Sequence, residues 1–586
     1  MILINNKKTS YHICTSKNAD ECVRFAANEL QKYLYKSTLC CIPLFSDKKE
    51  KRSKEILIGK DARDINQRVV SDLDGLSSEG YIIKEDNEEL LLIGNTSRST
   101  LYAVYRFLEE LIGFRALAKD EEIYKEKNII EFNNLYIKRD FSFEYREAYW
   151  TDAFDGEFAS KNFLNSNLAD ISIRHGGRNK WYNFHHSFSD LVNPEEYFDT
   201  HPEYFSLIDG KRIKEHTELC LSNPNVFNIV VSKIKEWIKN NPECKIFSVA
   251  QDEWMGHFIK MACECENCKK IDDENESQSG SIITFVNKVA DEIKKDYPDV
   301  LIHTFAYQYS RKPPKFVKPR DNVIVRLTNI ECSWEKSLEE KAALDNQCEE
   351  ANFIRYLDSW SKMTKRLYIW DYAVNYRNYL LPFPNLRSMA KNIELYRKYK
   401  VKGVLMQGNF SFGGGGYLDE LKSYVTAKLL QDENYKLDDL VKEFCDGYYK
   451  EAGKYIYQYA FLFEDQIKNE RMWLYDDADH TMFDEEIIKK ASNLLNKALA
   501  SVKNDTKYYK RVKRVSLGID YLKIVRLPLD YIDRNKLIDE FEENVRKQGI
   551  TELFERTNLD YSFEVMRNSR YAKDRPNWYS LYYIMR

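Results

Sequence analysis

The sequence predicts an α/β protein with a central (β/α)8 barrel, an α/β domain before it and a helical domain after it. Three observations predict this class. Short apolar runs alternate with amphipathic helices through the middle of the chain, polar or aromatic residues follow most of these runs, and the last part of the chain contains helical patterns alone. A chain of 586 residues is long enough to bury several cores. We place the domains at residues 1–135, 136–432 and 433–586.

The N-terminal domain shows a mixed pattern of helices and short strands. Amphipathic helices are predicted over residues 21–34 and 99–114, and buried strands over residues 55–59 and 90–95. The serine and threonine residues between the second strand and the second helix are typical of a helix N-cap. These elements predict one compact domain.

The middle of the chain alternates strand-like runs with helices, such as those predicted over residues 225–241 and 281–297. Such alternation predicts a parallel sheet, and a (β/α)8 barrel is the most economical way to close it. The predicted strands are FEYREAYW (143–150), LADISIRH (168–175), KIFSVAQDE (245–253), VLIHTFAYQY (300–309), NVIVRLTNIE (322–331), RLYIWDYAV (366–374) and GVLMQGNF (403–410).

Polar and aromatic residues collect at the carboxyl ends of these strands, where barrels of this class carry their active sites. We therefore expect the active site among these residues: Arg146, Glu147, His175, Asp252, Glu253, Tyr307, Glu331, Trp370, Asp371 and Gln407.

The remaining chain is helical in pattern and rich in charge, as residues 437–467 and 485–502 illustrate. No strand-like run competes with these helices, so we expect a C-terminal helical domain.

Charge and composition exclude several kinds of partner. The 89 basic and 93 acidic residues form no long block of one sign, which argues against nucleic acid and against a membrane surface. The aromatic share is 14%, and rings with polar tips suit stacking on sugars. We expect a carbohydrate ligand; a homo-oligomer is compatible with the sequence.

The sequence also carries an expectation about location. No window reaches the roughly 18 apolar residues that a membrane span needs, and the first residues, MILINNKKTSYHIC, lack the apolar segment of a signal peptide. We expect a cytoplasmic protein, or a secreted one where a leader has been removed.

Several ordered segments resemble known families. LYAVYRFLEELIGFRAL (101–117) resembles the N-terminal domain attached to α-glucuronidases and β-hexosaminidases. Other segments together resemble the bacterial DUF4838 family: HHSFSDLVNPEEYFDTHPEYFSLIDGKR (185–212), ELCLSNPNV (218–226), the C-x-C-x-x-C segment, YPDVLIHTFAYQYSRKPP (297–314), NVIVRLTNIECSW (322–334), RLYIWDYAVNY (366–376) and QGNFSFGGGGYLDELKSYVTAKLL (407–430).

The resemblance covers roughly residues 1–432 and implies a glycoside hydrolase related to the hexosaminidase and α-glucuronidase barrels. One position departs from the family pattern, in which the strand before the cysteines often ends in Asn-Asp. Here it ends in Asp252-Glu253. Such a pair is similar to the β-hexosaminidase arrangement, in which Glu protonates the leaving oxygen and Asp steers the substrate's acetamido group as nucleophile.

Glu253 is our candidate for the general acid. Cleavage of a glycoside needs a carboxylic acid that is still protonated near neutral pH, and burial beside a second carboxylate raises a Glu pKa enough to supply one. Asp252 would hold a polar group of the substrate or stabilise positive charge at the ring. The pair can also be a helix-start signal, with its acids at the positive end of the dipole.

Glu331 is the best candidate for a second carboxylate. Glu331 or Asp371 would supply the base or nucleophile if the reaction does not use an acetamido group. The alternative for Glu331 is a buried ion pair with Arg146.

The other candidates would bind sugar. Arg146 and Glu147 close the first barrel strand, where an arginine can hold hydroxyl groups with two hydrogen bonds. His185 and His186 offer one donor and one acceptor each when neutral. Tyr307 and Trp370 are candidate stacking platforms and Gln407 a further polar contact, although Tyr307 and Trp370 can equally be ordinary packing. The glycine run 413–416 lacks the Lys-Ser/Thr of a phosphate loop, so we expect a substrate-covering loop there.

The cysteines Cys263, Cys265 and Cys268 can hold one tetrahedral zinc ion, with Cys220, Cys332 or His257 as fourth ligand. Zinc here would be structural, because a thiolate-rich closed site leaves no position for water. Reduced thiols, or a disulfide with Cys220 or Cys332, are the alternatives. Catalysis itself would need no cofactor.

These observations predict an exo-acting glycoside hydrolase that cleaves a terminal sugar such as an N-acetylhexosamine. The first alternative is a glycosidase of the same fold that acts on an acidic sugar, as the α-glucuronidase-like N-terminal domain suggests. The second is a barrel that binds carbohydrate without cleaving it.

Overall fold

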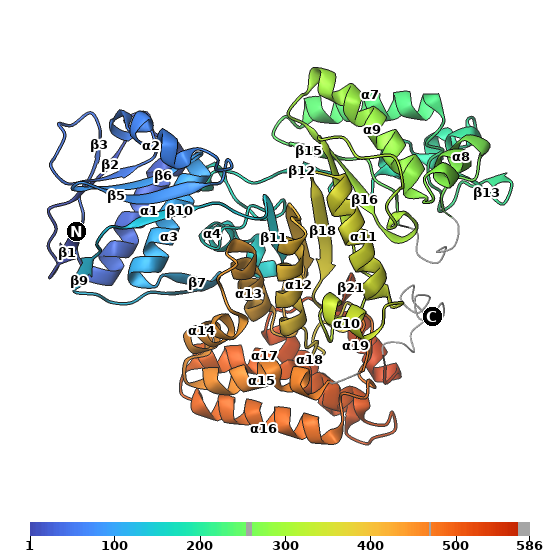
Figure 1. Cartoon of the computed structure of the whole chain (residues 1–586). Coiled ribbons are helices and arrows are strands. Elements are labelled where there is room, and N and C mark those ends of the chain that lie inside the picture. The colour runs from blue at the N-terminus through green and yellow to red at the C-terminus, as the bar shows by residue number, and fades with distance from the viewer. Residues whose placement is uncertain (254–260, 468–469, 572–586) are drawn as a thin grey trace. The chain divides into compact units, whose positions relative to one another are not determined.

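The computed structural model describes residues 1–253, 261–467 and 470–571 (Figure 1). The chain forms two compact units that are interleaved in sequence. Unit 1 contains Met1–Arg178 and Glu420–Gly453, and unit 2 contains Asn179–Asp419 and Lys454–Arg586. The division into three consecutive domains stays a prediction.

Unit 1 is built around a six-stranded mixed sheet with the order β10-β5-β6-β4-β2-β3. Helices α1 and α3 pack side by side against the sheet (Figure 1). The sheet strands are β2 (His12–Thr15), β3 (Leu44–Ser46), β4 (Glu55–Ile58), β5 (Tyr81–Asp86), β6 (Glu89–Gly94) and β10 (Tyr136–Arg139). The helices of the N-terminal part are α1 (Glu21–Thr38), α2 (Asn66–Leu73) and α3 (Ser97–Ile112). All four elements predicted for residues 21–114 are present.

The ends of these helices follow from their sequences. Asp20 caps α1 by accepting a hydrogen bond from the Val23 amide. Thr96 and Ser99 form a capping box at the start of α3, and Gly113 ends the helix with a φ of 64°, which glycine adopts without strain.

Unit 1 also holds shorter elements and two later helices. They are β1 (Ile2–Asn5), β7 (Arg115–Ala118), β8 (Glu121–Ile123), β9 (Ile129–Glu131), β11 (Tyr145–Tyr149), α4 (Gly156–Lys161), α13 (Asp419–Gln431, which begins at the unit boundary) and α14 (Leu437–Tyr449). The strand predicted over residues 168–175 is not formed: this segment is irregular and ends in a 3₁₀ turn at Ile173–His175.

Unit 2 is built around six parallel strands in the order β12-β15-β16-β17-β18-β19. They are β12 (Trp181–Tyr182), β15 (Ile246–Ser248), β16 (Leu301–Ala306), β17 (Val323–Thr328), β18 (Leu367–Tyr372) and β19 (Gly403–Gln407). The register places Thr328 beside Trp370 and Tyr372 beside Gln407, so the carboxyl ends of β17, β18 and β19 meet at one edge.

Helices follow most of these strands, as in an α/β barrel. They are α7 (Pro224–Asn240), α8 (Glu266–Glu274), α9 (Ser279–Asp296), α10 (Leu338–Leu344), α11 (Glu349–Met363) and α12 (Leu386–Lys398). Asn223 caps α7, and Pro224 occupies the first helical position, where its missing amide hydrogen costs nothing. The apolar runs and amphipathic helices therefore form the parallel α/β layer that the sequence predicts.

The C-terminal part of unit 2 is mainly helical, and α16 and α17 pack together (Figure 1). Its helices are α15 (Gly453–Gln466), α16 (Glu485–Ser501), α17 (Thr506–Arg526), α18 (Arg534–Lys547) and α19 (Leu559–Asn568). The sequence does not predict the small hairpin of β20 (Glu552–Phe554) and β21 (Thr557–Asn558) that interrupts them. Among the described residues, no helix is long and apolar enough to cross a membrane.

Candidate active site

A pocket lies at the carboxyl ends of the strands of unit 2. It contains about 760 Å³ of empty space including its open mouth, which lies within the roughly 300–1,000 Å³ of small-molecule sites. Its lining is polar and aromatic: His185, His186, Glu253, Phe305, Tyr307, Thr328, Ile330, Trp370, Tyr372, Tyr376, Gln407, Tyr475, Glu555 and Arg556. The residues proposed from the sequence for catalysis or sugar binding that belong to this lining are Glu253, His185, His186, Tyr307, Trp370 and Gln407.

Glu253 follows β15 and is held by two neighbours. The Tyr307 hydroxyl donates a hydrogen bond to its Oε1, and Nε2 of His186 lies 3.7 Å from its Oε2. The Glu253 side chain is 35% exposed, so it can reach a ligand while both oxygens stay oriented.

The hydrogen bonding of His186 determines which of its nitrogens carries the hydrogen when the ring is neutral. Nδ1 lies 2.6 Å from the carbonyl oxygen of Gln251, which can only accept, so Nδ1 carries the hydrogen. In the neutral ring Nε2 then presents a lone pair to Glu253. At 3.7 Å the two groups face each other at a distance longer than a hydrogen bond.

His185, the other histidine of the lining, lies near several positive charges. Burial is the largest cause that lowers the pKa of His185, and the charges of His186, Arg556 and Arg326 lower it further. Arg326 is buried below the pocket, where its guanidinium lies 4.0 Å from the ring centre of Trp181 and 5.3 Å from that of Trp370. An anion in the pocket would meet Arg556 directly, with buried Arg326 close to the Trp370 wall.

Aromatic side chains form the walls. Trp370 stacks on Phe184 with ring centres 5.9 Å apart, and its Nε1 donates to Oε1 of Gln407 over 2.7 Å. The Tyr376 hydroxyl donates to the Gln407 carbonyl over 2.9 Å. Fixed rings of this kind suit a sugar, which has apolar faces and a polar rim.

The hairpin β20–β21 supplies a second carboxylate and a cation. Glu555 is 8% exposed and Arg556 is exposed, and both line the pocket. The hairpin is fixed by backbone hydrogen bonds from Tyr379 to Leu553 and from Glu555 to Tyr376, at 2.9 Å and 3.0 Å. Glu253 and Glu555 are the two carboxylates in the described lining of this pocket.

Sequence reasoning missed Glu555, Arg556 and Tyr475, which come from the chain beyond residue 432. The hairpin strands have only three and two residues, too few to show an alternating pattern. The adjacent acid and base in LFERTN, within a predominantly helical region, are the one local signal of this site.

The glycine run 413–416 does not line the pocket and packs on the segment before this hairpin. A methyl group on Gly413 would lie 2.2 Å from the Gly549 carbonyl oxygen. Arg514 links the two segments, because it donates to the carbonyl oxygens of Gly413 and Gln548 over 2.7 Å and 2.8 Å. The run therefore allows a close backbone approach that positions the hairpin, in place of the substrate-covering role predicted for it.

Asp252 does not line the pocket, although its neighbour does. It is 5% exposed and accepts a hydrogen bond from the Ser189 amide over 2.8 Å. Burial raises the pKa of Asp252 to about 6. Burial and the charge of Asp252 raise the pKa of nearby Glu218 well above its usual range. Asp252 is thus part of a buried acidic pair behind the pocket.

Glu331 and Asp371 also lie outside the pocket lining. Glu331 pairs with Arg311 over 2.6 Å, so its ion pair involves Arg311 where the sequence suggested Arg146. Asp371 is buried and accepts hydrogen bonds from Asn329 and Tyr396 over 2.7 Å and 2.6 Å. Burial raises the pKa of Asp371 despite these bonds.

Arg146 and Glu147 lie on β11 in unit 1, and both are buried. Arg146 pairs with Glu79 over 2.6 Å. Glu147 accepts a hydrogen bond from the Tyr145 hydroxyl. Both residues thus have structural partners inside unit 1. His175, also in unit 1, lies 3.2 Å from Glu157.

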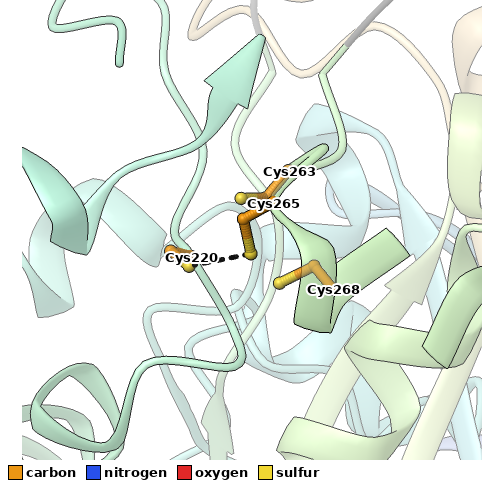
Figure 2. A group of neighbouring side chains, drawn as sticks. All are labelled: Cys220, Cys263, Cys265 and Cys268. Carbon is orange, nitrogen blue, oxygen red and sulfur yellow. Dashed lines mark hydrogen bonds between the residues drawn. The ribbon is translucent and has the colours of Figure 1, made fainter. Parts of the chain in front are cut away.

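The three cysteines of the C-x-C-x-x-C segment lie outside the pocket. They gather with Cys220 (Figure 2). Cys332 is buried elsewhere, close enough to Arg311 and Glu350 to feel their charges. His257 lies outside the described residues.

Comparisons with known proteins find similarity in the N-terminal sequence and in the fold. Residues 4–107 match the model described as glycosyl hydrolase family 67 N-terminus. No curated protein sequence matches the chain significantly. The solved structure of BtGH115A, described as a family GH115 4-O-methyl-α-glucuronidase with specificity for decorated arabinogalactans, is similar in fold. Its TM-score is 0.56, with 10% sequence identity over 95% of this chain and 81% of that one.

A second family model covers the larger part of the chain. Residues 117–460 match the model described as domain of unknown function DUF4838. Because this match spans more than half of the chain, the protein belongs to the DUF4838 family, and it is glycoside-hydrolase-like in its N-terminal sequence and in its fold.

Proposed function

We propose that the protein is an exo-acting glycoside hydrolase on a (β/α)8-type barrel that removes a terminal uronic acid. One observation carries the proposal: two carboxylates and an arginine, Glu253, Glu555 and Arg556, line one pocket between aromatic walls. The proposal takes up the acidic-sugar alternative and sets aside the N-acetylhexosamine, because Asp252, the residue that would steer an acetamido group, is buried against the Ser189 amide and does not line the pocket.

Glu253 donates the proton to the glycosidic oxygen in this proposal. The Tyr307 hydroxyl then stabilises the carboxylate that remains, and Nε2 of His186 lies beside it.

Glu555 supplies the second carboxylate, which acts on water or on the sugar carbon. Hydrolysis needs a second carboxylate that deprotonates water or attacks the sugar carbon directly, and Glu555 is the remaining acid of the described lining. Glu555 is 8% exposed and lines the pocket together with Tyr376 and Tyr475.

The preference for an acidic sugar rests on charge. Arg556 offers a planar pair of donors that matches a carboxylate. The charges of Arg556 and buried Arg326 also lower the pKa of His185 in the lining, after burial and His186, so the positive potential of both arginines reaches this side chain. A neutral N-acetylhexosamine would not use this potential. Because the similar structure BtGH115A is described as a 4-O-methyl-α-glucuronidase, α-linked glucuronic acid is the first sugar to test.

The proposal is tested by measuring the sugars released from oligosaccharides of xylan and arabinogalactan that carry glucuronic acid, with an aryl glycoside panel of glucuronide, glucoside, galactoside, fucoside and N-acetylglucosaminide alongside. We expect release of uronic acid from at least one substrate. Glu253→Gln should reduce the rate by about 100-fold or more.

Glu331→Gln is the matched control, because Glu331 is a carboxylate that follows another strand of the same sheet, β17, but pairs with Arg311 outside the pocket. It should keep most of the activity. Release of N-acetylhexosamine alone would overturn the proposal, and binding of the oligosaccharides without any turnover would favour a carbohydrate-binding barrel instead.

A further inference from the structure

Four cysteines from separate parts of the sequence converge in unit 2 (Figure 2). Cys263 and Cys265 lie in the loop before α8, Cys265 is the N-cap of this helix, and Cys268 is in its first turn. Cys220 comes from the segment before α7. The four sulfur atoms all lie within 4.8 Å of one another.

From this arrangement we propose that Cys220, Cys263, Cys265 and Cys268 bind one structural Zn²⁺ ion. Zinc holds four thiolates in a tetrahedron with Zn–S bonds of about 2.3 Å, which places the sulfur atoms about 3.8 Å apart. The Sγ atoms of Cys220 and Cys265 are 3.6 Å apart, close to this spacing. The fold therefore already holds the four sulfur atoms close to the positions that a tetrahedral zinc site requires.

Hydrogen-bond donors surround the sulfur atoms, as expected around a charged metal site. Four thiolates around Zn²⁺ carry a net charge of −2, which needs nearby donors. The Leu207 amide donates to Cys263 Sγ over 3.3 Å, and Nη1 of Arg212 lies 3.6 Å from the same sulfur. The Ser222 hydroxyl lies 3.6, 3.4 and 3.2 Å from Cys220, Cys265 and Cys268.

The fold around the cysteines supports a stabilising role for the ion. The local buried cluster consists of Cys220, Cys263 and Cys268, with partly buried Leu207 and Cys265 beside it. The hairpin that covers it, β13 (Leu207–Ile208) and β14 (Lys211–Arg212), has two residues in each strand. The cluster at the sulfur atoms is small, and a metal ion would link its segments directly.

Position and ligand type make the site structural and not catalytic. Four cysteines fill the coordination sphere, so no position is left for water or substrate. The ion would tie the segment 263–268, which follows the β15 strand end that carries Glu253, to the hairpin β13–β14. Three of the ligands are the cysteines that the sequence proposed, and among its candidates for the fourth ligand it is Cys220 that lies with them. The inference does not depend on the proposed function.

The test is the metal content of the full chain, expressed with added zinc, purified without chelator and measured by elemental mass spectrometry. We expect about one zinc per chain in the wild type. Cys268→Ser should lose most of it, whereas Cys348→Ser, which changes a cysteine outside the cluster, should keep it. Chelation at elevated temperature should lower the melting temperature of the wild type and expose four additional reactive thiols.

A second measurement does not depend on the variants. The metal-free wild type should take up one Co²⁺ and show the absorption of a tetrahedral cobalt–thiolate site, and Zn²⁺ should displace it. Wild-type protein that contains no zinc and takes up neither ion would overturn the proposal. So would iron bound in place of zinc, or mass spectra that show disulfide bonds among the four cysteines.

Discussion

At the scale of single residues, the adjacent acids Asp252 and Glu253 have different roles. Asp252 follows the same strand as Glu253, but it is buried against the Ser189 amide and does not line the pocket. Sequence alone cannot separate two adjacent acids, because consecutive residues at a strand end point to opposite sides and the pattern does not say which side holds the pocket.

Asp252→Asn should stabilise the protein at neutral pH. Burial raises the pKa of Asp252 from 3.8 to about 6. The folded state therefore binds more protons than the unfolded state between these values, and the wild type loses stability as the pH rises through this window. The loss is complete above about pH 6 and amounts to roughly 3 kcal/mol for two pKa units.

Chemical unfolding of both proteins at pH 4 and pH 7.5 measures the effect. The variant should match the wild type at pH 4 and exceed it at pH 7.5. Equal stability of the two proteins at both pH values would show that Asp252 does not titrate as its burial implies.

Glu555 carries a prediction about the reaction itself. Glu555→Ala should lower kcat by about 100-fold or more, because it removes the proposed base or nucleophile. A small anion such as azide fits the space that the side chain leaves, so sodium azide should restore part of the rate.

The products separate the two roles. Isolation of a glycosyl azide would place Glu555 on the face of the sugar from which the carbon is attacked. The anomeric configuration of the first product of the wild type then separates the roles, because a nucleophile gives retention and a base gives inversion. Full activity of Glu555→Ala without azide would remove Glu555 from the mechanism.

At the scale of elements, the long apolar runs were predictable and the short hairpin was not. Strands β16, β17, β18 and β19 lie within the predicted runs because buried parallel strands need continuous apolar sequence. The segment 168–175 has a similar apolar content but forms a 3₁₀ turn, and nothing in its pattern distinguishes the two outcomes. The β20–β21 hairpin depends on backbone hydrogen bonds to Tyr376 and Tyr379, which lie about 175 residues earlier.

Gly413→Ala tests whether the glycine run positions the hairpin. The added methyl group would collide with backbone atoms of the segment 549–551, which cannot move without shifting Glu555 and Arg556. We expect KM to rise and kcat/KM to fall about 10-fold or more, with a stability loss of about 1–3 kcal/mol.

Phe412→Ala is the matched control, because Phe412 is the neighbouring residue and is 93% exposed. It should leave both quantities almost unchanged. Unaltered kinetics in Gly413→Ala would show that the hairpin does not depend on this approach.

At the scale of the whole molecule, unit 2 joins the strands to the C-terminal helices. The Trp334 amide donates to the Met472 carbonyl over 3.0 Å, and the Tyr376 amide donates to the Leu474 carbonyl over 2.9 Å. The pocket takes Tyr475, Glu555 and Arg556 from this C-terminal part. Helical periodicity predicted the helices themselves, but it carries no information about which strand ends they cover.

A fragment that ends at Gly453 tests this arrangement. It lacks the part of unit 2 that packs on residues 330–335 and 375–380, so apolar surface around Trp334 and Tyr376 would be exposed to solvent. We expect a fragment that binds a hydrophobic dye, unfolds without a sharp transition and has no activity. A monomeric fragment with the cooperative unfolding of the full chain would contradict the prediction.

Selection of an acidic sugar by the pocket is measured by the ratio of kcat/KM for a glucuronide to kcat/KM for the matched glucoside. The two substrates differ only in a carboxylate against a hydroxymethyl group. In the wild type the ratio should strongly favour the glucuronide. Arg556→Ala should lower this ratio by about 10- to 100-fold, the value of one charge-assisted hydrogen bond of roughly 1.5–3 kcal/mol.

Arg546→Ala, which removes an arginine paired with Glu542 on α18, should leave the ratio unchanged. A ratio near one in the wild type, or one that does not respond to Arg556→Ala, would contradict a glycosidase pocket that selects uronic acids.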